Sequence, residues 1–152
     1  MMNIDMKTER IISNELKLVP YYPSGVALSW YQDKDVVRQV DDIDEVYTQD
    51  KLDAMYDYLN KHGDCFYISY QGKLIGDVSL YDKDKIAIVI CKEYQNRHIG
   101  RECVKEIIRL AKEKHLKSVQ AHIYSFNRQS QNMFLSLGFF EDNREQFVYK
   151  IR

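Results

Sequence analysis

The segment IAIVICKEYQNRHIGRECVKEIIRLAKEK, residues 86–114, decides the fold of this chain. It opens on five apolar residues in a row, a pattern typical of a strand that is covered on both faces. Over 100–114 the apolar side chains instead recur at helical spacing, and the stripe consists of Val104, Ile107, Ile108 and Ala111. Between them lies a polar connection, residues 93–99, that is longer than a strand-to-helix turn requires. A buried strand, a polar loop and an amphipathic helix are therefore expected in succession.

The polar loop is a candidate site for an anion. A helix that begins near Gly100 leaves its first backbone N–H groups without partners, and the helix dipole adds about half a positive charge there. A glycine lets a ligand approach this backbone closely, and Arg97 and Arg101 bracket it with guanidinium groups that suit phosphate oxygens. We therefore expect a phosphate-bearing ligand at this loop. The alternative is a solvated turn in which the glycine and the charges only end one element and start the next.

The rest of the chain predicts a mixed α/β domain spanning residues 1–152. The predicted strands are 15–22, 65–70, 73–80, 85–91, 118–124 and 146–151. The predicted helices run from Ser24 toward Gln32, over 33–40 as a turn or short helix, over 49–61, over 100–114, and from Asn127 or Ser130 to Gly138. Gly63 is expected to end the helix over 49–61, and Gln71-Gly72 to form a hairpin turn.

Composition and charge exclude several classes of protein. With 45% hydrophobic residues the chain is globular, and its 22 basic and 23 acidic side chains give no bulk attraction to nucleic acid or to an anionic membrane. No apolar run approaches the roughly 18 residues that span a bilayer, and MMNIDMKTER lacks the apolar core of a signal peptide. We therefore expect a cytoplasmic protein without nucleic-acid or membrane partners.

The three cysteines, Cys65, Cys91 and Cys103, are odd in number and widely spaced, which favours a reduced chain without disulfides. His62 and Cys65 lie close in sequence, but a zinc site needs three or four protein ligands and no second pair stands out. We therefore expect no metal.

Two motifs resemble those of the GNAT N-acetyltransferases. Tyr94-Gln95-x-x-His98-Ile99-Gly100, after an apolar strand, resembles the acetyl-CoA loop Gln/Arg-x-x-Gly-x-Gly/Ala of that family. Asn127-x-x-Ser130-x-x-x-Phe134-x-x-x-Gly138-Phe139 resembles its second motif. The resemblance covers residue 65 to the C-terminus, and the N-terminal part more loosely. It implies a largely antiparallel sheet flanked by helices, with the strands over 85–91 and 118–124 splayed apart to admit acetyl-CoA as cosubstrate.

The resemblance also assigns the residues that bind acetyl-CoA. It places the pantetheine arm on the backbone of Ile88, Val89 and Ile90. The pyrophosphate would rest on the loop and the start of the helix, that is on Gln95, Asn96, Arg97, His98, Ile99, Gly100 and Arg101. Asn127 matches a position whose side chain touches the cofactor. Phe134 stands where many relatives carry a tyrosine.

Two of these positions depart from the family pattern. His98 replaces the first glycine of the loop, so a positive φ there would strain a histidine. Phe134 cannot protonate the leaving sulfur of coenzyme A as the usual tyrosine does. A thiol has a pKa near 8.5, so this sulfur is expected to leave as a thiolate.

The reaction implied by the resemblance is direct acetyl transfer to a primary amine in a ternary complex. A backbone N–H of the strand, near Ile90, would donate a hydrogen bond to the oxyanion. Strand alternation puts Gln120, His122 and Tyr124 on one face. His122 lies where the branch that acetylates ribosomal-protein N-termini carries a glutamate base. A histidine titrates near neutral pH, so His122 is the candidate base, and simple packing on the strand is the alternative.

Two carboxylates, Asp77 and Glu93, are weaker candidates for the base. A CoA-binding sensor or scaffold with little or no turnover is the alternative function, and the departures at His98 and Phe134 support it. The sequence leaves the acceptor amine and the oligomeric state open.

Overall fold

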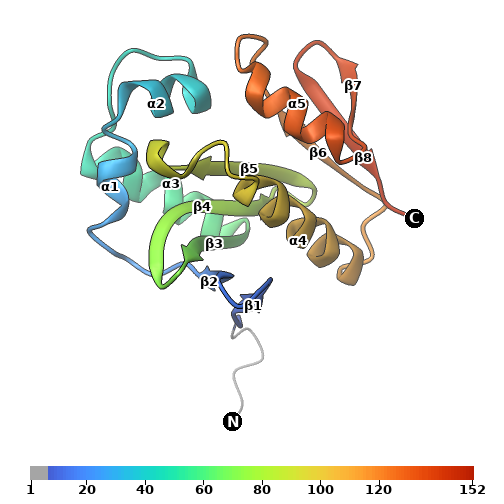
Figure 1. The fold of residues 1–152 in the computed structure, drawn as a ribbon, viewed down its shortest axis with the longest axis horizontal. Coiled ribbons are helices and arrows are strands. Elements are labelled where there is room, and N and C mark those ends of the chain that lie inside the picture. The colour runs from blue at the N-terminus through green and yellow to red at the C-terminus, as the bar shows by residue number, and fades with distance from the viewer. Residues whose placement is uncertain (1–6) are drawn as a thin grey trace.

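Eight strands form one sheet in residues 7–152, the part of the chain that this computed structural model describes (Figure 1). Their order across the sheet is β1-β2-β3-β4-β5-β6-β8-β7, and every neighbouring pair is antiparallel except β5 and β6. The strands are β1 (Arg10–Ile11), β2 (Leu16–Pro20), β3 (Gly63–Tyr70), β4 (Lys73–Tyr81), β5 (Lys85–Ile90), β6 (Ser118–His122), β7 (Phe140–Asn143) and β8 (Gln146–Lys150). The predicted mixed α/β fold with a largely antiparallel sheet is confirmed.

In the described part of the chain, five α-helices pack on this sheet: α1 (Ala27–Trp30), α2 (Lys34–Asp41), α3 (Gln49–Lys61), α4 (Ile99–Glu113) and α5 (Arg128–Ser136). A short 3-10 turn, η1 (Lys92–Tyr94), follows β5. The hydroxyl groups of Tyr31, just after α1, and Tyr56 on α3 reach Asp77 of β4, whereas Gly100 of α4 lies against the side chains of Ile88 and Ile90. Because successive strand residues alternate between faces and Asp77 pairs with Val89, α1–α3 and α4 cover opposite faces.

Helix α3 has the predicted bounds, and Thr48 caps it by accepting a hydrogen bond from the backbone N–H of Lys51. The helix predicted from Ser24 is shorter than expected. It covers only α1, and Ser24 does not cap it, because its hydroxyl accepts a weak bond from the N–H of Val26 in the preceding turn. The hairpin turn is confirmed: Gln71 and Gly72 have φ of 51° and 79°, as a type I′ turn requires.

Gly63 directly follows the C-cap residue of α3, as predicted, but it does not have the positive φ of a capping glycine. His62 ends the helix, and Gly63 begins β3, where a Cβ would lie 2.1 Å from the carbonyl oxygen of Leu80. The residue is therefore a glycine because two strands approach closely, and not because the chain needs a left-handed turn.

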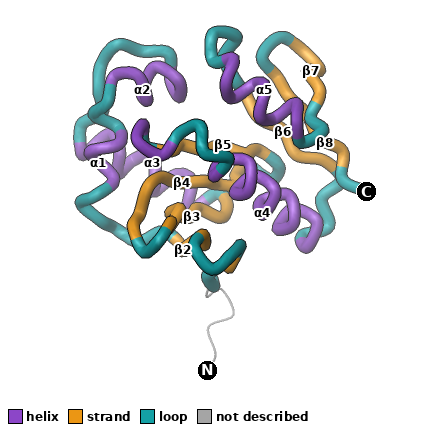
Figure 2. The backbone as a smooth tube through the Cα atoms, in the orientation of Figure 1, coloured by secondary structure: helices purple, strands orange, loops and turns teal. Residues whose placement is uncertain are grey.

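Strands β1 and β7 were not expected from the sequence. β1 has two residues, and β7 is the exposed stretch Phe-Glu-Asp-Asn, so neither offers a buried alternating pattern. Figure 2 shows β7 and β8 next to β6 and α5, which together form the C-terminal part of the sheet and its cover.

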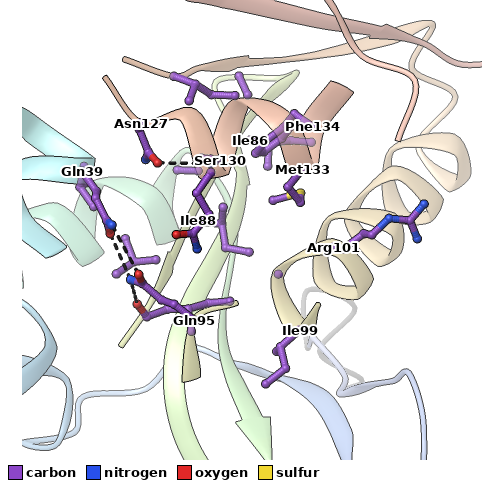
Figure 3. A pocket seen from close by; sticks show the side chains of 18 of the residues that line it. Gln39, Ile86, Ile88, Gln95, Ile99, Arg101, Asn127, Ser130, Met133 and Phe134 are labelled. Carbon is purple, nitrogen blue, oxygen red and sulfur yellow. Dashed lines mark hydrogen bonds between the residues drawn. The ribbon is translucent and has the colours of Figure 1, made fainter. Parts of the chain in front are cut away.

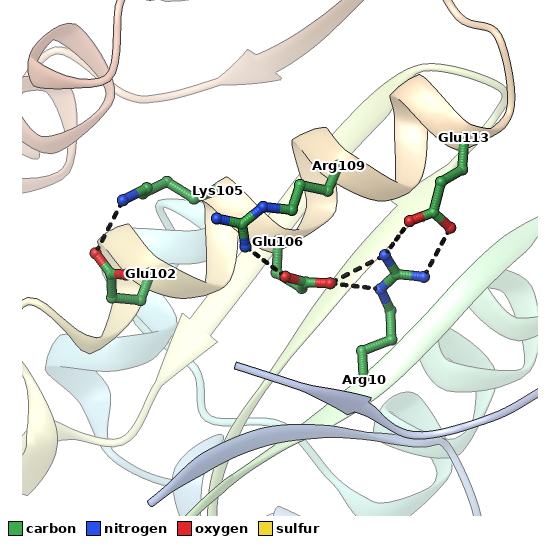
Figure 4. Close-up of polar contacts among 6 residues, drawn as sticks. All are labelled: Arg10, Glu102, Lys105, Glu106, Arg109 and Glu113. Carbon is green, nitrogen blue, oxygen red and sulfur yellow. Dashed lines mark hydrogen bonds and ion pairs between the residues drawn. The ribbon is translucent and has the colours of Figure 1, made fainter. Parts of the chain in front are cut away.

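The first strand is held to α4 by a network of ion pairs (Figure 4). The Arg10 guanidinium donates to Glu106 at 2.9 Å and to both carboxylate oxygens of Glu113 at 2.7 and 3.1 Å. Glu106 is only 7% exposed and also accepts a bond from Arg109 at 2.7 Å. The Arg10 guanidinium holds the pKa of Glu113 below its usual value. The network therefore fixes the middle and C-terminal part of α4, and the N-terminal end of the same helix follows the loop over residues 95–98.

None of the helices within residues 7–152 is long and apolar enough to cross a membrane. The part of MMNIDMKTER that comprises residues 1–6 lies outside the described residues, so the expectation about a signal peptide rests on the sequence there.

Candidate functional site

A cleft of about 880 Å³ opens between β5 and β6 (Figure 3). The two strands pair only at Lys85 and Gln120, where the Gln120 N–H donates to the carbonyl of Asp84 at 2.9 Å. Beyond that point they diverge, and the cleft is lined on one side by residues 86–90 of β5 and on the other by residues 121–123. The predicted splaying of the two central strands is confirmed.

The structure brings the residues that the sequence singled out for the cofactor, and the first candidate base His122, to this one cleft. Its lining includes Ile88, Val89, Ile90, Gln95, Asn96, Arg97, His98, Ile99, Gly100, Arg101, His122, Asn127 and Phe134. It also includes residues from α2 and α3 that the sequence did not identify, namely Val36, Gln39, Val40, Met55, Tyr58 and Leu59. Their helical spacing was the available signal, but a stripe of this kind is equally typical of core packing.

The free backbone groups of β5 are set by its pairing with β4. The N–H of Cys91 donates to the carbonyl of Ile75, which makes the Gly76–Ile90 pair one of the non-hydrogen-bonded pairs of the ladder. By alternation Val89 exchanges hydrogen bonds with Asp77, while Ile88 and Ile90 direct their N–H and C=O groups into the cleft. The side chain of Val89 still lines the cleft, but its backbone is used within the sheet.

The loop between η1 and α4 turns twice through the left-handed region. Asn96 and His98 both have φ of 63°, so the positive φ expected to strain a histidine at position 98 is present. His98 is the N-cap residue of α4, and its side chain caps no backbone N–H. The first helical bond runs from the Glu102 N–H to the His98 carbonyl, so the N–H groups of residues 99–101 have no partner inside the helix.

Gly100 leaves space in front of these amides. A Cβ at this position would lie 3.2 Å from Cδ1 of Ile90 and 3.7 Å from both Cδ1 of Ile88 and Cε of Met133. A larger side chain here would enter the volume between the helix start and β5. The helix start can thus accept an anion that approaches along β5.

The loop is tied to its surroundings through Gln95. Its side-chain amide donates to the carbonyl of Ile90 at 2.8 Å and to Oε1 of Gln39 at 3.0 Å, as Figure 3 shows for the glutamine pair. Arg97 lies over the ring of Tyr94 at 5.0 Å, and Arg101 contacts the hydroxyl of Ser136 at 3.3 Å. The two guanidinium groups therefore sit at the cleft and are held there by neighbouring side chains.

The second motif forms the opposite wall. Asn127 caps α5 by accepting a bond from the Ser130 N–H at 3.2 Å. Phe134 is only 2% exposed and packs edge-on against Phe139, with 4.9 Å between ring centroids. Its ring is thus core beneath the cleft, with no proton to offer.

His122 lies at the end of β6 with half of its side chain exposed. Its Nε2 is 3.7 Å from Oε1 of Glu145, and its ring meets the edge of Tyr124. The backbone N–H of Ser125 donates to Glu145 at 2.6 Å and holds the pKa of that carboxyl below its usual value. Glu145 was not expected from the sequence, because it comes from the turn between β7 and β8, 23 residues further along the chain.

The weaker base candidates lie elsewhere. Asp77 is 2% exposed, does not line the cleft, and accepts hydrogen bonds from the hydroxyl groups of Tyr31 and Tyr56, both at 2.7 Å. Burial raises the pKa of Asp77 to about 6. Glu93 lies in η1 and does not line the cleft either.

The pKa of Asp77 predicts a pH-dependent stability. The folded state binds this proton more tightly than the unfolded chain, where aspartates titrate near 3.9, so the stabilisation is full below about pH 4 and is lost as the pH rises through about 6. Denaturant unfolding of Asp77→Asn should lack this dependence, so the difference in unfolding free energy from the wild type should change by about 3 kcal/mol across that range. Asp44→Asn, in an exposed loop, is the control, and parallel curves for wild type and Asp77→Asn would contradict the prediction.

No group of three histidine, cysteine, aspartate or glutamate side chains within residues 7–152 is placed to hold a metal ion. Cys65, Cys91 and Cys103 are free and buried, and burial raises the pKa of the Cys65 and Cys103 thiols to about 12. A thiolate at either position is therefore disfavoured at neutral pH.

Solved structures share this fold at low sequence identity. The acetyltransferase from Agrobacterium tumefaciens str. C58 has a TM-score of 0.77 at 14% identity, over 100% of this chain and 99% of that one. An acetyltransferase from Salmonella typhimurium that modifies the N-terminal serine of a 50S ribosomal subunit protein has a TM-score of 0.76 at 14% identity, covering 95% and 100%. The spermidine N-acetyltransferase from Vibrio cholerae, solved with CoA and spermine, has a TM-score of 0.69 at 18% identity, covering 91% and 94%.

No curated protein matches the sequence. Residues 27–139, however, match the family model described as Acetyltransferase (GNAT) family. That match runs from the first residue of α1 to the residue after Gly138, and so it takes in both walls of the cleft. The chain therefore belongs to the GNAT acetyltransferase family.

Proposed function

We propose that residues 1–152 act as a single acetyl-CoA-dependent N-acetyltransferase domain, which moves the acetyl group directly to a primary amine in a ternary complex. The observation that carries this proposal is the cleft itself. Unpaired backbone groups of β5 and unpaired N–H groups at the start of α4 face the same space. The solved relatives support it, since one was solved with CoA and spermine and another modifies an N-terminal serine.

In this proposal each part of acetyl-CoA meets a different part of the cleft. The amide groups of the pantetheine arm bind free backbone groups of Ile88 and Ile90, as a strand would. The Ile90 carbonyl is not among them, because it already accepts a bond from the Gln95 side chain. The pyrophosphate binds the N–H groups of residues 99–101, with Arg97 and Arg101 beside it. Charge-assisted hydrogen bonds contribute about 1.5–3 kcal/mol each, so three or four of them offset the entropy lost on binding.

The reaction needs a neutral amine, an oriented carbonyl and a leaving group. The amine nitrogen forms the new C–N bond, the C–S bond breaks, and the amine proton passes to His122. Of the backbone N–H groups of Ile88 and Ile90, the one that the pantetheine arm leaves free donates to the oxyanion. The thiolate leaves without a phenol to protonate it, because Phe134 takes the place of the usual tyrosine and is buried. A cytoplasmic location remains a prediction from the sequence.

A CoA-binding sensor is the second candidate, and Phe134 is the observation that favours it. Two measurements separate the candidates. Release of free thiol from acetyl-CoA in the presence of a panel of amines establishes a transferase. A thermal shift with CoA but no thiol release with any amine would establish the sensor instead.

His122 is tested by a matched pair of substitutions. His122→Asn should lower kcat at least tenfold and leave the Kd for CoA within twofold, because a general base typically contributes 10²–10⁴-fold to the rate and does not touch the cofactor's phosphates. His115→Asn, at an exposed position after α4, is the control and should retain full activity. An unchanged kcat in His122→Asn would remove this residue from the mechanism.

A further inference from the structure

The wall of the cleft opposite α4 and α5 belongs to α2 and α3, and we call it the acceptor wall: Val36, Gln39, Val40, Met55, Tyr58 and Leu59. The start of α4 packs against Ile88 and Ile90 on one face of β5, whereas Val89 points to the other face, toward α2 and α3. The ring of His122 packs edge-on against the ring of Tyr124, with 4.8 Å between centroids, and Tyr124 is close to Asp41 at the end of α2. With the pantetheine arm along β5 and the pyrophosphate at the start of α4, the amine reaches the thioester from the acceptor wall.

The cleft offers no negative side chain to an incoming cation. Among the lining residues within 7–152, none is an aspartate, a glutamate or a lysine, and the groups that carry or can gain a positive charge are Arg97, Arg101 and the histidines at 98 and 122. A polyamine or a lysine side chain would thus carry its positive charge into a space without an anionic partner, where an unpaired charge is strongly disfavoured.

Four carboxylates near this wall are already engaged. Asp41, which follows Val40 at the end of α2, accepts a bond from the Tyr47 hydroxyl at 2.8 Å and pairs with Lys51 at 3.5 Å. Asp82 accepts two bonds from the Tyr58 hydroxyl, at 2.8 and 2.9 Å, outside the lining. Asp77 is buried on β4 and accepts hydrogen bonds from two tyrosine hydroxyl groups, and Glu145 faces His122. None of the four lines the cleft, where it could bind an ammonium group.

The acceptor wall is instead mostly apolar. Val36 and Val40 lie one turn apart on α2, and Met55 and Leu59 lie one turn apart on α3. Such a surface stabilises an apolar group carried next to the reacting amine. The hydroxyl of Tyr58 and the amide of Gln39 are the polar groups among these six residues.

On the basis of the proposed function, we infer that the acceptor is an α-amine on an apolar residue, and not a polyamine or a lysine side chain. An α-amine has a pKa of about 7.7–8.0, against about 10.4 for lysine. At pH 7 its neutral fraction is therefore about 300-fold larger. It can enter the cleft without a carboxylate to pair with, and it can react with only a histidine as base.

Thiol release from acetyl-CoA is the test, with acceptors at equal concentration at pH 7. The panel comprises leucine amide, a tripeptide that begins with leucine, the same tripeptide beginning with aspartate, free leucine, Nα-acetyl-lysine amide and spermidine. We expect kcat/KM for the leucine tripeptide to exceed that of the aspartate tripeptide at least tenfold, and those of the lysine derivative and spermidine at least 100-fold. Comparing tripeptide, amide and free amino acid shows whether a peptide or a small molecule supplies the amine.

A pair of isosteric variants tests the charge argument directly. Gln39→Glu places one carboxylate in the acceptor wall without a change of volume and should raise kcat/KM for spermidine relative to the leucine tripeptide at least fivefold. Gln32→Glu adds the same charge at an exposed position just before α2 and outside the lining, and it should leave that ratio unchanged.

The outcomes separate this inference from the proposed function. Acetylation of spermidine or of the lysine derivative with kcat/KM at or above that of the leucine tripeptide would overturn the inference and leave the transferase in place. Binding of CoA, measured by calorimetry, with no acetylation of any acceptor would overturn both. No shift in selectivity in Gln39→Glu would contradict the charge argument.

Discussion

Gly100→Asp should weaken the binding of CoA at least 100-fold and leave the protein folded. The new carboxylate would occupy the space in front of the N–H groups of residues 99–101 and repel the pyrophosphate. Losing two charge-assisted hydrogen bonds at about 1.5–3 kcal/mol each already corresponds to 100-fold or more. An acidic residue in the first turn of a helix interacts favourably with the helix dipole, so the fold should survive. Calorimetric titration with CoA measures the Kd, and thermal unfolding checks the fold.

Gly100→Ala is the matched control for this charge. Its Cβ would lie 3.2 Å from Cδ1 of Ile90, a flexible side-chain end that can move by a few tenths of an ångström. We expect its Kd for CoA to stay within tenfold of the wild type. If Gly100→Asp bound CoA within threefold of the wild type, the helix start would not be the phosphate site.

Gly76→Ala should destabilise the protein by about 3 kcal/mol or more, which is the upper part of the range for overpacked positions. A Cβ at this position of β4 would lie 2.1 Å from the carbonyl oxygen of Val89 and 3.0 Å from the Cα of Ile90. Both contacts are with backbone, so β5 itself would have to move. Thermal unfolding should show a fall in Tm of about 6–12 °C.

Gly25→Ala provides the control, because a Cβ added at this glycine would meet no atom within 4 Å. It should be neutral or slightly stabilising, since alanine restricts the unfolded chain. A Tm for Gly76→Ala within 2 °C of the wild type would show that β4 and β5 can separate at little cost. The same variant should also lose affinity for CoA, because the displaced residues include Ile90.

The sequence predicted most of the fold because most elements carry a local signal. The stripe of α4, the helix α3 and the hairpin at Gln71-Gly72 all depend on residues close together in the chain. The features that the sequence analysis missed have a common cause, which is contact with distant parts of the chain. Gly63 looked like a helix end but is required by Leu80, 17 positions away, and β1 and β7 are strands only because a longer neighbour pairs with them.

In the candidate site, too, the residues of contiguous motifs could be predicted, and those from distant segments could not. The loop before α4 and the cap at Asn127 are contiguous motifs, so the sequence located them. Glu145 beside His122, and Gln39 beside Gln95, come from distant segments that only the folded sheet brings together. The alternation that commits the backbone of Val89 to β4 also depends on strand register, which no single segment determines.

The ion pairs of Arg10 also bear on how the chain is made. Arg10 and Glu113 are separated by 103 positions, so during synthesis the first strand has no partner on α4 until most of the protein has left the ribosome. Contacts between such distant positions carry a loop-closure cost and tend to form late in folding. We therefore expect β1, which is translated early, to be fixed in place late in folding. It becomes ordered together with α4, the helix whose start would bind the phosphates of CoA.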